Sequence, residues 1–255
     1  MDKRPVGVMD SGVGGLTVAS VLRRLYPEES IVYFGDSRRN PYGERPPEEI
    51  ARFASEIKAF LLEKGVKAVI VGCNTITFNV PASFYEGPVP VVGMSLDFSG
   101  MERAQSVAVF ATPASIATHA HRDGLARAMP GASVIEVPCD GLAHAIESSV
   151  PAGEIRQMIR SAAEAYHADH AEVAVFGCTH YPLVRALFEE VMPHTRFWDP
   201  AEETVRFAMA RLAAAGALSD ARGADHFYFS AGLETAAQLA AKALGQPVPC
   251  ELAKL

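Results

Sequence analysis

Two short stretches of the chain each place a cysteine directly after an apolar run. The stretch Val69 to Phe78 reads VIVGCNTITF and contains Cys73, and the stretch Val173 to Val184 reads VAVFGCTHYPLV and contains Cys178. A thiol at the start of a helix lies at the positive end of the helix dipole, which stabilises its thiolate. Two such thiols on opposite sides of one carbon could remove a proton from one face and deliver a proton to the other. That chemistry inverts the configuration of the carbon.

Polar side chains follow both cysteines and also end the first apolar run. Asn74 and Thr75 follow Cys73, while Thr179 and His180 follow Cys178; all four could hold a carboxylate or an amino acid backbone. In DSGVGGLTV, the glycines let the backbone approach a ligand, and the aspartate, Asp10, could assist a nearby thiol or only cap the next helix. The motif lacks the GxGxxG spacing and the lysine of a P-loop, which argues against a nucleotide.

The elements that would position these residues alternate along the chain. Short apolar runs predict strands near residues 6–9, 31–34, 68–71, 90–93, 107–110, 134–137 and 173–176. Amphipathic segments predict helices near residues 46–65, 115–129, 154–167 and 181–191. This alternation is typical of an α/β fold with doubly wound parallel sheets.

An internal repeat divides the chain into two similar halves. VGVMDSGVGG aligns with VAVFATPASI, and VIVGCNT aligns with VAVFGCTH, both at an offset of about 100 residues. We expect a first domain of residues 1–97 plus 208–255 and a second of residues 98–207, with the alternation interrupted again near Pro200. Ligands of open α/β sheets bind at the carboxyl ends of the strands, so the two cysteines would flank one cleft.

Composition excludes several classes of protein. The 255 residues are 49% hydrophobic, with a net charge of -7 and no basic block, which disfavours a nucleic-acid partner. No apolar run is long enough to cross a membrane and the N-terminus lacks a signal sequence, so we expect a cytoplasmic protein.

The four cysteines are too widely spaced for a disulfide scaffold. Cys139 and Cys250 are expected to be small apolar side chains, and His119 and His121 to lie on the surface.

Five stretches together resemble a known family. DSGVGGLTV, YFGDSRRNPYG, GCNT, GCTHYPL and DPAEET are similar to segments of the cofactor-independent Asp/Glu racemases, the family of the glutamate racemases. The resemblance implies two pseudo-symmetric α/β domains with the active site between them. It also implies inversion of glutamate without pyridoxal phosphate, metal or nucleotide, a role in supplying D-glutamate for peptidoglycan, and a possible homodimer.

The resemblance also implies roles for individual residues. Cys73 and Cys178 would be the two catalytic thiols, with Asp10 assisting the first, His180 assisting the second, and Glu147 as an acidic group of the second domain. The implied substrate contacts are Ser11, Pro41, Tyr42, Gly43, Asn74, Thr75, Thr112, Ser115 and Thr179. Asp36 matches a carboxylate with a supporting role.

Departures from the family pattern leave alternatives open. Ile76, Thr77 and Phe78 add bulk after the first thiol, Ser115 replaces a threonine, and Asp97 stands where a glutamate is usual. The chain could therefore be an aspartate racemase or a related cofactor-independent racemase of the same superfamily that acts on another acid. Two further hypotheses are a zinc site built from Asp10, Cys73, Cys178 and His180, and a ligand-binding protein without turnover.

Overall fold

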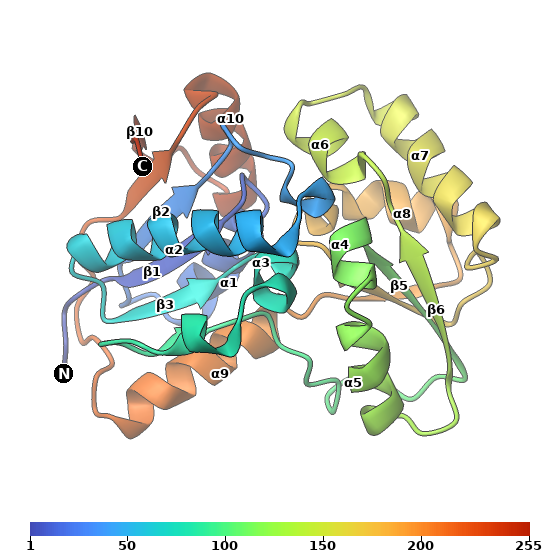
Figure 1. The fold of residues 1–255 in the computed structure, drawn as a ribbon, viewed down its shortest axis with the longest axis horizontal. Coiled ribbons are helices and arrows are strands. Elements are labelled where there is room, and N and C mark those ends of the chain that lie inside the picture. The colour runs from blue at the N-terminus through green and yellow to red at the C-terminus, as the bar shows by residue number, and fades with distance from the viewer.

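The computed structural model covers residues 1–255 and divides into two lobes, each built around its own parallel sheet (Figure 1). The predicted fold class, two parallel-sheet α/β domains, is confirmed. None of the helices combines the length and the apolar character that crossing a bilayer requires.

The first sheet has six strands in the order β10-β9-β2-β1-β3-β4. Their bounds are β1 (Val6–Asp10), β2 (Ile31–Gly35), β3 (Ala68–Val71), β4 (Val91–Val92), β9 (His226–Phe229) and β10 (Cys250–Leu252). The inner strands β1, β2 and β3 are buried along their whole length, as expected for parallel strands covered by helices on both faces. Val8 pairs with both Tyr33 and Ile70, so the carboxyl ends of these three strands meet at one edge.

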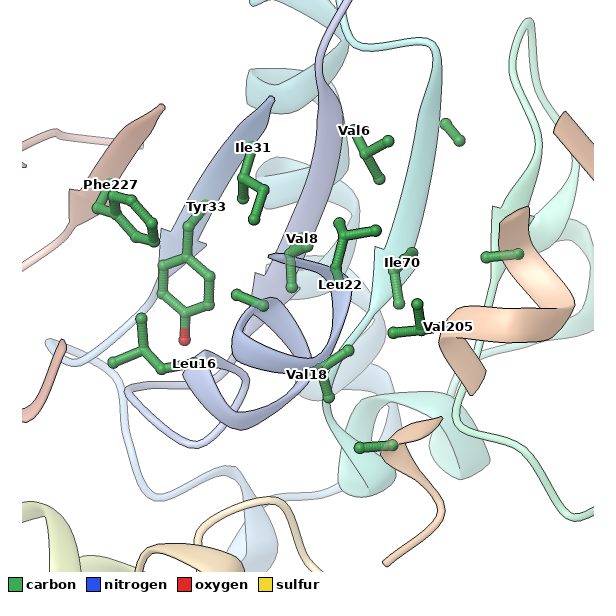
Figure 2. Close-up of a cluster of buried hydrophobic side chains, with 14 of the residues drawn as sticks. Val6, Val8, Leu16, Val18, Leu22, Ile31, Tyr33, Ile70, Val205 and Phe227 are labelled. Carbon is green, nitrogen blue, oxygen red and sulfur yellow. The ribbon is translucent and has the colours of Figure 1, made fainter. Parts of the chain in front are cut away.

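Helices cover both faces of this sheet. They are α1 (Leu16–Leu25), α2 (Pro47–Glu63), α3 (Asn74–Asn79), α9 (Ala201–Ala214) and α10 (Leu233–Leu244). Figure 2 shows one face, where Val8 and Ile70 of the sheet pack with Leu22 of α1 and Val205 of α9. The other face packs against α2, whose residues Ile50, Phe53, Ala54, Ile57 and Leu61 are all buried.

The second sheet has four strands in the order β6-β5-β7-β8. Its strands are β5 (Ser106–Ala111), β6 (Ser133–Pro138), β7 (Val173–Gly177) and β8 (Arg196–Trp198). Its helices are α4 (Pro113–Ile116), α5 (Ala120–Ala128), α6 (Leu142–Glu147), α7 (Ala152–Ala165) and α8 (Arg185–Val191). One apolar cluster of this lobe centres on Phe188, whose ring lies 5.1 Å from that of Phe176 and 5.3 Å from that of Phe110.

The helix predicted over residues 115–129 is in fact two helices, α4 and α5, separated at His119, which has a φ of 55°. Thr112 caps α4, since its Oγ1 accepts a hydrogen bond from the Ser115 amide. Thr118 then donates its hydroxyl to the Ser115 carbonyl and accepts from the Ala120 amide. These side-chain bonds compete with the helical backbone pattern and turn the chain.

Helix α9 packs on the first sheet although it directly follows the last strand of the second. Ala201, Val205 and Leu212 all belong to the apolar cluster that lies against α1 (Figure 1). The chain therefore returns to the first lobe at the start of α9.

Candidate active site

Both predicted thiols line a single cavity between the two lobes. Cys73 follows β3 and precedes α3, and Cys178 follows β7 and precedes a turn of 3₁₀ helix at Tyr181–Val184. The space around them measures about 460 Å³, including its mouth. The other lining residues are Ser11, Asn40, Pro41, Tyr42, Gly43, Glu44, Asn74, Thr75, Thr112, Pro113, Cys139, Gly141, Ala143, His144, Thr179 and His180.

The surroundings of Cys73 keep its sulfur protonated. Burial, and next the charge of Asp10, raise the pKa of the Cys73 thiol well above its ordinary value. The Cys73 Sγ lies 3.6 Å from the hydroxyl of Ser11. Asp10 is fully buried, and burial raises the pKa of its carboxyl group. No hydrogen bond joins Asp10 to Cys73. Asp10 Oδ1 instead accepts from the Gly12 amide at 2.7 Å, and Oδ2 accepts from the Thr179 hydroxyl at 3.2 Å.

The surroundings of Cys178 are cationic. The Cys178 Sγ lies 3.8 Å from His180 Nδ1, and His180 Nε2 lies 2.9 Å from Glu147 Oε2. Burial alone would lower the pKa of His180, but its contacts with Cys178 and Glu147 outweigh burial and raise that pKa well above the ordinary value. The Cys178 sulfur and the Glu147 carboxylate thus contact the same imidazole from its two nitrogens. Cys178, His180 and Glu147 form a chain of sulfur, imidazole and carboxylate, and Glu147 lies outside the cavity itself.

The glycines of the first motif make room for this chain. A Cβ atom at Gly12 would lie 2.1 Å from Glu147 Oε2, and one at Gly14 would lie 2.5 Å from His180 Nδ1. The backbone after β1 can approach the second lobe this closely only without side chains at these positions.

Hydrogen bonds join the lobes around the cavity. Asn40 of the first lobe donates to Glu147 Oε2 at 2.6 Å, and the hydroxyls of Thr75 and Thr112 lie 2.9 Å apart across the two lobes. Ser115 Oγ accepts from Thr112 at 3.0 Å. Ser115 does not line the cavity, and its hydroxyl contacts both Thr112 and, at 3.5 Å, Thr75.

The loop before α2 forms a further wall of the cavity. Pro41 is followed by a turn of 3₁₀ helix at Tyr42–Glu44. The Tyr42 hydroxyl donates to Asp36, whose other oxygen accepts from Ser230 of the first lobe at 2.7 Å. Asp36 therefore fixes this loop and does not itself line the cavity. A Cβ atom at Gly43 would lie 2.8 Å from Thr112 Cβ, so this loop also packs closely on the second lobe.

Comparison with known proteins identifies the family. Residues 14–208 match the family described as Asp/Glu/hydantoin racemase. The chain belongs to this racemase family. It is 38% identical over 212 residues to a protein of Streptococcus thermophilus named glutamate racemase. The alignment covers 81% of this chain and 78% of that protein.

Solved structures of racemases share the whole fold. A glutamate racemase of Bacillus anthracis, isoform RacE1, superposes with a TM-score of 0.90 at 28% identity and covers 100% of this chain and 99% of its own. A glutamate racemase of Francisella tularensis, solved in complex with D-glutamate, superposes with a TM-score of 0.88 at 27% identity, covering 100% of this chain and 98% of its own.

Three residues near the racemase cavity were missed or misjudged from the sequence. Asn40 was not among the expected site residues, although its loop was expected near the substrate; it lines the cavity and donates to Glu147. Cys139 was expected to be inert; it is buried but also lines the cavity, and burial raises the pKa of its thiol to about 12. His121 was expected on the surface, and this is wrong because its side chain is only 1% exposed.

The zinc hypothesis finds no support in the arrangement of side chains. No group of three or more histidine, cysteine, aspartate or glutamate side chains is placed to hold a metal ion. Each thiol instead contacts a different neighbour: Cys73 lies beside Ser11, and Cys178 lies beside His180.

Proposed function

We propose that this chain is a glutamate racemase, which interconverts L- and D-glutamate by proton transfer at Cα and supplies D-glutamate for peptidoglycan. Its family and its relatives named glutamate racemase support this substrate. The single observation that carries the mechanism is that Cys73 and Cys178, from opposite lobes, line one cavity.

The reaction needs one sulfur as a base and the other as an acid. The Cys178 thiolate, stabilised by His180, takes the proton from Cα, and the Cα–H electron pair stays on the carbon and spreads into the carboxylate. The Cys73 thiol then gives its proton to the opposite face, which forms the enantiomer. The reverse direction uses the same groups with their roles exchanged. The two steps are proton transfers only, with one sulfur as base and the other as acid, so atoms and charge balance over each turnover.

Polar groups of the cavity would hold the substrate while charge develops. The side-chain nitrogen of Asn74 supplies an unpaired donor beside the two sulfurs, whereas the hydroxyl of Thr179 already donates to Asp10. Donors fixed in advance at a developing negative charge stabilise the transition state more than the ground state. The hydrogen bonds between the lobes hold the cavity closed, which excludes water from the carbanionic carbon.

Two substitutions and a control test this proposal. Cys73→Ala and Cys178→Ala should each lower the rate of racemisation by at least about 100-fold, the range of a lost acid or base. Cys250→Ala is the control, because Cys250 lies on β10 and does not line the cavity. Racemisation is followed by circular dichroism from each enantiomer, and solvent deuterium incorporation at Cα by mass spectrometry.

The outcomes separate the alternatives. Wild-type turnover of glutamate with loss in both alanine variants supports the proposal. Turnover of aspartate but not of glutamate would show that aspartate is the substrate and would leave the two-thiol mechanism standing. Binding of glutamate with no deuterium incorporation at Cα identifies a binding protein instead, and near-normal turnover in either alanine variant contradicts the two-thiol mechanism.

A further inference from the structure

Asn74 carries an unused hydrogen-bond donor in the cavity. Its side chain is 2% exposed, and the Nδ2 atom has no partner within the chain. A buried donor without a partner is destabilising, so such a group persists where a ligand uses it. The amide can present either its oxygen or its nitrogen to the cavity, and only a second contact can decide between the two.

That second contact comes from His121 of the other lobe. His121 Nε2 lies 3.3 Å from Asn74 Oδ1. With the Asn74 oxygen facing the ring, as the structure has it, the imidazole donates through Nε2–H, because a carbonyl oxygen only accepts. Burial lowers the pKa of His121 to about 4, so the ring is neutral at pH 7 and has a single N–H to donate.

The ring of His121 is itself held in place from both lobes. The Phe78 ring of the first lobe contacts it edge to face, with centroids 4.8 Å apart and planes at 74°. Gly177, at the end of β7, lies directly beneath it, and a Cβ atom there would be 3.2 Å from His121 Cε1. The bulk that Phe78 adds after the first thiol therefore packs on His121.

We propose that His121 is a positioning residue, which fixes the Asn74 amide with its oxygen toward the imidazole and its NH2 group toward the substrate. The contact forms only when the lobes meet, because Asn74 begins α3 of the first lobe and His121 lies in α5 of the second. The Asn74 side-chain amide is therefore oriented only while the two lobes are in contact. His121 does not line the cavity and touches the substrate only through Asn74.

Kinetics of matched variants test this role, and this readout rests on the proposed function. His121→Phe keeps a ring against Phe78 but cannot donate, and it should lower kcat/KM for glutamate about tenfold. His121→Gln retains a donor and should recover most of that loss. His119→Asn is the control, because His119 pairs with Glu136 outside the cavity and asparagine tolerates its positive φ.

A double-mutant cycle shows whether His121 acts through Asn74. In an Asn74→Ala background, His121→Phe should cost nothing further, since the amide it orients is gone. An equal loss in both backgrounds would overturn the inference, as would unchanged kinetics of His121→Phe in the wild-type background.

A spectroscopic measurement is independent of turnover. Nitrogen-15 NMR of the histidine side chains should show His121 at pH 7 as the neutral Nε2–H tautomer. The Nδ1–H tautomer would require the opposite orientation of Asn74 and would refute the inference, whether or not the chain racemises glutamate. Absence of glutamate turnover in the wild type would instead count against the proposed function alone.

Discussion

Replacing Glu147 with glutamine tests the link between charge and the thiol at Cys178. The substitution keeps the shape of the side chain and its contact with Asn40, but it removes the negative charge beside His180. The side chains of His180 and Glu147 are 3% and 12% exposed, so solvent screens this pair little. A hydrogen bond to a charged group contributes about 1.5–3 kcal/mol and a neutral one about 0.5–1.5 kcal/mol.

Losing this difference, about 1–1.5 kcal/mol, lowers the pKa of His180. The same free energy lost from the transition state lowers kcat/KM about tenfold. Because L- and D-glutamate have equal free energies in water, kcat/KM must fall by the same factor in both directions. The values of kcat and KM need not change equally.

The assay is racemisation of each enantiomer followed by circular dichroism, with the pKa of His180 measured by NMR titration. Glu136→Gln is the matched control, since Glu136 forms a similar pair with His119, at 2.8 Å, away from the cavity. The reasoning is refuted if Glu147→Gln lowers the pKa of His180 while kcat/KM stays within about twofold of wild type. An equal loss of activity in Glu136→Gln would also refute it.

Two further predictions concern stability. The raised pKa of His180 means that its pair with Glu147 stabilises the fold fully below about pH 6.5 and less as the pH rises through the raised value. Urea unfolding of wild type and Glu147→Gln should therefore differ more at pH 6, where the imidazolium and the carboxylate are both charged, than at a pH above the raised value, and a difference that grows over that range would contradict this. Phe188→Ala should lower the free energy of unfolding by about 3–5 kcal/mol, because Phe188 is fully buried in the aromatic cluster of the second lobe. Phe207→Ala, at a position 58% exposed, should change it by less than about 0.5 kcal/mol in the same urea titration.

The positions of the two thiols could be predicted from the sequence because the parallel strands that precede them determine those positions. Cys73 and Cys178 follow strands whose apolar runs are continuous, and the carboxyl ends of neighbouring parallel strands meet at one edge of a sheet. The repeat then indicated two such edges facing one cleft. Within each lobe, pattern and topology were enough to place the thiols.

Contacts between the lobes could not be predicted in this way. His121 looked like a surface histidine because its helix is short and polar, and its partners Asn74 and Phe78 are distant in the sequence. Asn40 bonds Glu147 across 107 positions of sequence, so nothing local indicated that contact. Periodicity reports which face of an element is buried but not which residues of another lobe cover it.

The repeat is symmetric in backbone but not in charge, and a two-thiol mechanism needs that difference. If both sulfurs were protonated, neither could take a proton, and if both were thiolates, neither could give one. Here Cys178 has the imidazolium of His180 beside it, whereas burial and the nearby Asp10 keep Cys73 protonated. The second lobe therefore places a cation beside its sulfur, whereas the first lobe places a buried carboxyl group near its own. In the proposed mechanism each turnover exchanges the protonation states of the two sulfurs, so the acid and the base must return to their starting states before the same enantiomer can react again.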